Sequence, residues 1–230
     1  MNISGKWALV TGSSRGIGKE IVKALADRGC NLILHSRSLN HTTPLAEELS
    51  KKGINVHQIE CDLADVSKAE FLADRAEELS GGLDIVYNNA AVMTKYRTDY
   101  LYAEYDEYNL SFTVNTIVPI IICSKILPKM IERGFGRIVN ITSGIKDEPE
   151  LAPYAVSKAA LDKYVYDMTK KLENTGVTMN LLDPGWLRTD LGGEKAPNSV
   201  DTVIPGALMP IITDEFACGK LFHAQDYKDK

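Results

Sequence analysis

Thr11-Gly12-Ser13-Ser14-Arg15-Gly16-Ile17-Gly18 follows directly on an apolar run at residues 7–10, and a pattern of helical period begins at once at Ile17. Glycines in such a turn let the backbone bend tightly and approach a pyrophosphate closely. The phosphate charge then meets the free N–H groups and the positive dipole end of the helix. The stretch therefore predicts a phosphate cradle between a first strand and a first helix, and a glycine turn without a ligand is the weaker interpretation.

Strand and helix patterns alternate along the whole chain. Short apolar runs rich in β-branched residues are separated by segments with helical periodicity. Near-continuous apolar strands joined by helices indicate a parallel sheet covered on both faces, with ligands at the carboxyl ends of the strands. The sequence predicts one doubly wound α/β domain over residues 1–230. The candidate strands are residues 7–10, 32–34, 56–59, 85–87, 137–141 and 177–182, and the candidate helices are residues 17–28, 44–52, 66–79 and 154–173.

Composition excludes several classes of protein. The 26 Lys and Arg residues are scattered and are outnumbered by 31 Asp and Glu residues, so we expect no nucleic-acid partner. The first six residues do not read as a signal peptide, and the apolar run at residues 117–123 is too short for a membrane helix, which predicts a cytoplasmic protein with a buried helix there. Four separate cysteines and four separate histidines predict no metal site and no disulfide framework.

The glycine spacing carries a family resemblance. It reads G-x-x-x-G-x-G behind a Thr-Gly opening, which differs from the G-x-G-x-x-G pattern of many dinucleotide-binding domains. This spacing resembles that of the short-chain dehydrogenase/reductase family, and the resemblance extends over essentially the whole chain. It implies a Rossmann fold, a nicotinamide cofactor and an oxidoreductase, with carbonyl reductases and 3-oxoacyl-[acyl-carrier-protein] reductases among the similar members.

The end of the second candidate strand predicts the cofactor. An acid at this place would bind the adenosine ribose of NAD, whereas a basic residue accommodates the 2′-phosphate of NADP. The chain reads Leu34-His35-Ser36-Arg37-Ser38, which holds no acid. Arg37 and Arg15 can both reach such a phosphate with charge-assisted hydrogen bonds. We therefore expect NADP(H) in preference to NAD(H).

The resemblance adds further cofactor contacts after three other strands. Cys61-Asp62-Leu63 resembles the segment of the family that touches adenine, and Asn88-Asn89-Ala90-Ala91 resembles its Asn-Asn-Ala-Gly turn. Ala91 departs from the glycine of the family, which an ordinary backbone conformation would tolerate. Asp183-Pro184-Gly185-Trp186-Leu187-Arg188-Thr189 resembles the segment around the nicotinamide. The cofactor contacts implied here are Asp62, Leu63, Asn89, Ala90, Ala91, Pro184, Gly185 and Thr189.

Pro153-Tyr154-Ala155-Val156-Ser157-Lys158 holds the candidate catalytic pair. Tyr154 and Lys158 lie four residues apart and hence on one face of a helix that Pro153 can open. A tyrosine with a pKa near ~10 donates a proton readily, and a nearby ammonium brings that pKa toward working pH. By resemblance Lys158 also holds the nicotinamide ribose, and both side chains contact the cofactor.

Two more residues complete a tetrad. Ser143, at the end of the fifth candidate strand, can hydrogen-bond a substrate oxygen as charge builds on it. Thr142 is the alternative for this role. Asn115 stands where the resembled family keeps an asparagine that holds a water for proton relay. The resemblance thus assigns Asn115, Ser143, Tyr154 and Lys158 to transfer of a hydride from NADPH to a ketone or aldehyde, or the reverse alcohol oxidation.

Other functions remain open at this point. The link after Thr189 is short, which argues against the interpretation as a 3-oxoacyl-[acyl-carrier-protein] reductase. A regulator or scaffold that binds NADPH without turnover would not need the tetrad, and a sugar-nucleotide epimerase would need a larger C-terminal domain. Five tyrosines at residues 96–108 either line a substrate entrance or pack on a partner subunit, with packing preferred. Trp186 is interpreted as a packing residue at the mouth of the site rather than a determinant of specificity. Family resemblance implies a homodimer or homotetramer.

Overall fold

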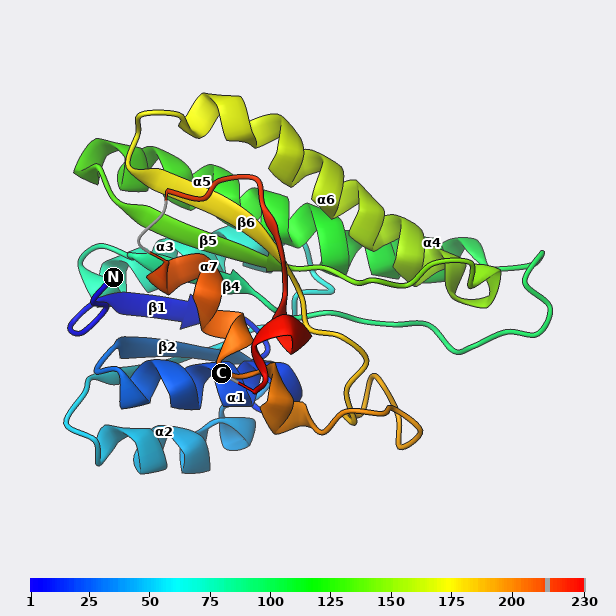
Figure 1. Ribbon diagram of the computed structural model, residues 1–230, viewed down its shortest axis with the longest axis horizontal. Helices are drawn as coiled ribbons and strands as arrows, with labels where there is room; N and C mark the ends of the chain where they lie inside the picture. The colour runs from blue at the N-terminus through cyan, green and yellow to red at the C-terminus, as the bar shows by residue number, and fades with distance from the viewer. Residues whose placement is uncertain (214–215, 230) are drawn as a thin grey trace.

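A computed structural model describes residues 1–213 and 216–229 as seven parallel strands in one sheet, in the order β3-β2-β1-β4-β5-β6-β7. Helices cover both faces of the sheet (Figure 1), which confirms the predicted doubly wound Rossmann fold. All six predicted strands are present: β1 has its predicted bounds, β2 is three residues longer and each of the other four is one residue longer. Their bounds are β1 Trp7–Val10, β2 Asn31–Ser36, β3 Val56–Glu60, β4 Ile85–Asn88, β5 Gly136–Ile141 and β6 Val177–Asp183.

A seventh strand, β7 (Leu221–His223), was not predicted. It pairs in parallel with the end of β6 and closes one edge of the sheet. Only three residues long and exposed at both ends, it has no periodicity by which a sequence could show it.

Two helical layers sandwich the sheet. The helices α1 (Gly16–Asp27) and α2 (Thr43–Ser50) bury their apolar faces in one hydrophobic cluster, and α3, α5 and α6 bury theirs in the other. The remaining helices are α3 Ser67–Ser80, α4 Tyr105–Phe112, α5 Val118–Arg133, α6 Ala152–Leu172 and α7 Met209–Ile212, with short 3-10 segments at Leu39–His41, Pro149–Leu151, Val200–Val203, Gly206–Leu208 and Ala224–Tyr227.

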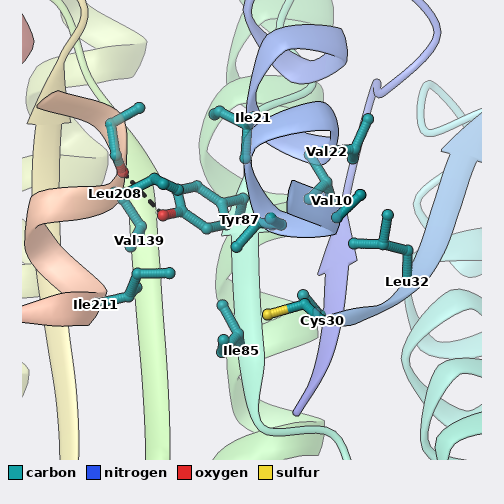
Figure 2. Packing of buried hydrophobic residues seen from close by; sticks show 14 of the residues in the cluster. Val10, Ile21, Val22, Cys30, Leu32, Ile85, Tyr87, Val139, Leu208 and Ile211 are labelled. Carbon is teal, nitrogen blue, oxygen red and sulfur yellow. Dashed lines mark hydrogen bonds between the residues drawn. The ribbon is translucent and has the colours of Figure 1, made fainter. Parts of the chain in front are cut away.

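Strand alternation divides the core between the two faces. Ala8 and Val10 of β1 belong to the cluster under α1, whereas Leu9 between them belongs to the cluster under α3 and α5. Figure 2 shows the first cluster around Tyr87, a fully buried residue of β4. Its hydroxyl donates a hydrogen bond of 2.8 Å to the carbonyl oxygen of Ala207. The C-terminal segment is thereby tied to the centre of the sheet.

The apolar run at residues 117–123 lies in a long continuous helix. By length and composition Tyr105–Arg133 could cross a membrane, and 56% of its most apolar window is buried inside the protein. Val118, Ile122 and Cys123 pack against α3 and the sheet, as expected of a buried helix. One turn of this helix, Thr113–Ile117, has π geometry.

Candidate active site

The glycine turn forms an open cradle at the carboxyl end of β1. Gly12 takes a left-handed backbone with φ of +64°, which glycine adopts without a steric penalty. A Cβ on Gly18 would stand 2.4 Å from the carbonyl oxygen of Gly12, so the helix can approach the turn this closely only with glycine. Arg15, the N-cap of α1, makes no capping hydrogen bond through its side chain. The first N–H groups of α1 therefore remain available to a phosphate group.

Asn89 fastens this turn to the end of β4. Its amide nitrogen Nδ2 donates to the carbonyl oxygens of Thr11 at 2.8 Å and Gly12 at 3.1 Å. The Thr11 hydroxyl accepts hydrogen bonds of 2.9 Å from the backbone N–H groups of Asn89 and Ala90. The side chain of Asn89 thus shapes the cradle. The backbone of Ala91 lies outside the left-handed region, as an alanine in place of the family's glycine requires.

The predicted 2′-phosphate ligands lie at the surface. Arg37 follows β2 and is exposed. The guanidinium of Arg15 lies 2.8 Å from the Asp190 carboxylate, and both side chains of this ion pair are largely exposed. Asp62 is exposed after β3 and accepts a hydrogen bond of 3.0 Å from the N–H of Ala64. These side chains lie at the surface beyond the carboxyl ends of β1, β2 and β3.

One histidine in this region was missed by sequence reasoning. His35 is only 2% exposed, and its imidazole bridges the glycine turn and the end of β3. Burial lowers the pKa of His35 to about 4. The sequence shows only a histidine in a strand, because the bridge arises from residues 23 and 26 positions away.

Tyr154 and Ser143 meet at the carboxyl end of β5. Tyr154 stands in the first turn of α6, which Pro153 opens at its second position, as predicted. Burial raises the pKa of Tyr154, a hydrogen bond with Ser143 lowers it, and the charge of Asp183 raises it. Because burial outweighs the lowering, the predicted fall of the tyrosine pKa beside a lysine is absent. The phenol remains protonated at neutral pH and can act as an acid.

Lys158 lies one helical turn beyond the tyrosine and is 2% exposed. Its ammonium donates a hydrogen bond of 2.6 Å to the carbonyl oxygen of Ile141 and lies 5.9 Å from the centre of the Tyr154 ring. Burial lowers the pKa of Lys158 to about 8, and the charge of Asp162 works in the opposite direction. The charge of Asp162 therefore offsets only part of the effect of burial on the Lys158 ammonium.

The π turn brings Asn115 toward the same site. Its amide Nδ2 donates to the Val92 carbonyl at 2.9 Å and to the Ser157 hydroxyl at 3.0 Å, and its Oδ1 accepts from the N–H of Val92. Ser157 lies between Tyr154 and Lys158 on α6. π turns commonly occur at functional sites, where the extra residue redirects side chains and carbonyl groups.

Thr142, the alternative to Ser143, also lines the cleft, but its side chain lies beside Asp162. It is buried, and it lies close enough to Asp162 to lower that carboxyl's pKa, although burial of Asp162 is the larger influence and raises it. Ser143, in contrast, lies close enough to Tyr154 to lower the pKa of its phenol, although burial of Tyr154 is the larger influence and raises it. The geometry favours Ser143 for contact with a substrate oxygen.

A cleft of about 690 Å³ opens above these residues. Trp186 lines it and is 58% exposed, with its indole N–H fixed to the Gly192 carbonyl at 2.7 Å. The ring thus lies at the mouth of the cleft, and its packing role there stays a prediction. The lining also includes Asn89, Ala91, Tyr96, Ser143, Tyr154, Lys158, Asp183, Pro184, Gly185 and Thr189.

The tyrosine-rich stretch divides between two environments. Residues 91–104 form an irregular loop that extends from the body beside residues 142–151 (Figure 1), and the N–H of Arg97 donates to the Glu150 carbonyl. Tyr96 lines the cleft, as a substrate entrance would require. Tyr100, Tyr102 and Tyr105 are exposed, and α4 begins only at Tyr105.

The chain matches known proteins over most of its length. Residues 6–199 match the family model for short chain dehydrogenases. The chain is 31% identical over 200 residues to the oxidoreductase UcpA of Salmonella typhimurium, which covers 86% of this chain and 75% of that protein. It is 32% identical over 201 residues to a short-chain type dehydrogenase/reductase of Picea abies, covering 82% and 73% of the two chains.

Solved structures agree with this assignment. A blue fluorescent protein from a metagenomic library, in complex with NADPH, is 26% identical and superimposes with a TM-score of 0.87 over 97% of both chains. A gluconate 5-dehydrogenase from Burkholderia cenocepacia, in complex with NADP and tartrate, is also 26% identical, with a TM-score of 0.84 over 96% of this chain and 93% of that one. The chain therefore belongs to the short-chain dehydrogenase/reductase family and is an oxidoreductase.

Proposed function

We propose that the chain is an NADPH-dependent reductase of ketones or aldehydes, which also catalyses the reverse oxidation of alcohols. The observation that carries the proposal is the position of Tyr154. Its hydroxyl lies close enough to Ser143 for that residue to lower the pKa of the phenol, and it stands one helical turn from a buried lysine at the wall of a cleft large enough for a small organic molecule. An acid, a second hydroxyl and a cation thus converge where a carbonyl oxygen can bind.

Each residue of the proposed tetrad has a distinct task. The cofactor, when bound, supplies the hydride. Ser143 donates a hydrogen bond to the carbonyl oxygen, and Tyr154 transfers its proton to that oxygen as negative charge builds up. Lys158 stabilises the tyrosinate that remains. Asn115 fixes the π turn to the start of α6 through its hydrogen bond with Ser157. In alcohol oxidation the same proton returns to Tyr154.

The rate of reduction should fall as pH rises through about 8, the pKa of Lys158. The lysine is an ammonium below this pH and neutral above it, and only the ammonium stabilises a tyrosinate. We expect kcat/KM for the carbonyl substrate to decline about tenfold per pH unit on the alkaline side. Initial rates between pH 6 and 10 at saturating NADPH measure this profile. A decline of kcat/KM that begins only near pH 10 would show that a group other than Lys158 controls the rate at alkaline pH.

We propose NADP(H) in preference to NAD(H) because Arg37 follows β2 where NAD-binding relatives of the fold carry an acid. Replacing Arg37 with Asp removes a charge-assisted hydrogen bond and adds repulsion of a phosphate. We expect the ratio of kcat/KM for NADPH to that for NADH to fall about 100-fold, equal to about 2.7 kcal/mol. Arg28→Asp, an exposed substitution at the end of α1, is the matched control and should leave the ratio unchanged. An unchanged ratio in Arg37→Asp would remove this residue from cofactor selection.

Two other functions fit the site less well. A 3-oxoacyl group on acyl carrier protein arrives on an arm that carries a phosphate, yet Lys146 and Glu148 both line the cleft and their charges offset each other. This part of the mouth therefore offers no excess positive charge to such an arm. A regulator that binds NADPH without turnover has no use for an acid beside a buried lysine.

The experiment that tests the function is the oxidation of NADPH, followed at 340 nm, against a panel of diketones, quinones, aldehydes and acetoacetyl thioesters. Turnover of a carbonyl compound with a preference for NADPH over NADH supports the reductase. Preferred turnover of acetoacetyl thioesters points to the acyl-chain alternative. Tight binding of NADPH with no turnover of any compound favours the regulator.

We further propose a cytoplasmic homodimer or homotetramer. Apolar side chains on the outer faces of the helices α4–α6 are exposed in the single chain, among them Leu110, Val156 and Tyr166. Exposed apolar side chains gathered on one helical layer are typical of contacts between subunits. Light scattering gives the mass in solution, to be compared with 25.3 kDa for one chain.

A further inference from the structure

The imidazole of His35 makes two hydrogen bonds, one to the turn after β1 and one to the end of β3. Its Nδ1 accepts a hydrogen bond of 3.1 Å from the backbone N–H of Gly12. Its Nε2 lies 3.2 Å from the carbonyl oxygen of Cys61, the residue before Asp62. One imidazole thereby connects the first glycine of the cradle with the turn that follows β3.

The two partners fix the form of the imidazole. A backbone N–H can only donate and a carbonyl oxygen can only accept, so Nδ1 must be bare and Nε2 must carry the proton. This is the neutral ring, and burial favours it further by lowering the pKa to about 4. The backbone of His35 is fixed as well, since its carbonyl accepts a hydrogen bond of 3.0 Å from the N–H of Ser13 and its N–H donates to the Ser13 hydroxyl at 3.0 Å.

The bridge has a consequence for the phosphate cradle. The N–H of Gly12 is already engaged by His35, so the donors left for a pyrophosphate are those of the later residues of the turn and the first turn of α1. The second contact of the ring holds Cys61 and the turn through Asp62 at a constant separation from that cradle. Both walls between which an adenosine half would bind therefore depend on one buried side chain.

We propose that His35 is a positioning residue for the dinucleotide, which sets cofactor affinity by holding the glycine turn and the β3 turn apart at the width of the adenosine half. The proposal rests on the proposed use of NADP(H). His35 contacts only the protein in this arrangement. Its effect should therefore appear in cofactor affinity and not in the hydride-transfer step at the far end of the cleft.

Two substitutions separate the two hydrogen bonds. In His35→Asn the side-chain oxygen takes the place of Nδ1 and retains the bond from Gly12. In His35→Gln the side-chain nitrogen takes the place of Nε2 and retains the bond to Cys61, but leaves the N–H of Gly12 without its partner. Direct titration of each protein with NADPH, followed by nucleotide fluorescence, gives Kd without any need for turnover.

We expect His35→Gln to weaken NADPH binding by about tenfold, because it leaves a buried donor unpaired, and His35→Asn to weaken it by about threefold. His35→Leu, which loses both bonds, should weaken it by more than His35→Gln. The kcat at saturating NADPH and the KM for the carbonyl substrate should stay within about twofold of the wild type in all three. His57→Gln, in the neighbouring strand β3 where His57 stacks on Trp7, is the control and should leave Kd unchanged.

A Kd for His35→Gln equal to that of the wild type would overturn the proposal. So would a fall of kcat in parallel with the loss of affinity, because that pattern indicates general disruption of the fold. The melting temperature of each protein without NADPH identifies such disruption. If His35→Gln does not fold, the more conservative His35→Asn still tests the proposal through its expected loss of NADPH affinity, about threefold in Kd. Absence of NADPH binding by the wild type would contradict the proposed function itself.

Discussion

Replacing Tyr154 with phenylalanine is expected to lower kcat by about 10²–10⁴-fold, the contribution typical of a positioned general acid. The substitution removes only the hydroxyl. The phenyl ring fills the same buried space in the first turn of α6, so the fold and the affinity for NADPH should be retained. The measurement is kcat at saturating NADPH and carbonyl substrate, with NADPH binding followed separately by fluorescence.

Tyr166→Phe is the matched control for this experiment. Tyr166 lies on the same helix, but its ring is exposed and does not line the cleft. Loss of its hydroxyl should leave kcat unchanged. A Tyr154→Phe enzyme with near-normal kcat would show that another group donates the proton, and the assignment of the tetrad would fail with it.

Replacing Gly18 with alanine is expected to weaken NADPH binding by more than about tenfold and to destabilise the fold by about 1–3 kcal/mol. The added Cβ would stand 2.4 Å from the Gly12 carbonyl oxygen and 2.6 Å from Asn89 Nδ2. Helix and turn must then separate, and the hydrogen bonds from Asn89 to the turn lengthen or break. Chemical denaturation gives the free energy of unfolding, and fluorescence titration gives the NADPH Kd.

Gly53→Ala separates this clash from the ordinary cost of replacing a glycine. Gly53 has a φ of +78° and no atom within 4 Å of the added Cβ, so alanine there introduces backbone strain of about 1 kcal/mol and no clash. Its NADPH Kd should equal that of the wild type. If Gly18→Ala behaves like Gly53→Ala in both measurements, close contact between the helix and the turn is not needed for binding.

Features encoded in short stretches of sequence could be predicted well. Six strands, the helix of Tyr154 and Lys158 and the turn at Gly12 each depend on local spacing, because backbone geometry fixes which residues share a face. The family match confirms the fold and the oxidoreductase class. Within the site, Ser143 and Thr142 could not be separated from sequence, since the choice depends on which way each side chain points after the strand ends.

Features that arise only from tertiary contact could not be predicted. The role of His35 requires Gly12 and Cys61 to lie on either side of it, and nothing in strand β2 alone indicates them. The edge strand β7 is too short to carry a pattern. The hydrogen bond that fixes the indole N–H of Trp186 to Gly192 could not be predicted either, because it depends on how the loop after β6 folds.

The π turn at Thr113–Ile117 sets a rule for insertions and deletions in this chain. A π turn holds one residue more than an α turn, so removing one residue here would restore α geometry and redirect Asn115 away from Val92 and Ser157. Substitutions on the exposed face of this helix would disturb nothing comparable. A one-residue deletion within the π turn should therefore be as damaging as the loss of a catalytic group.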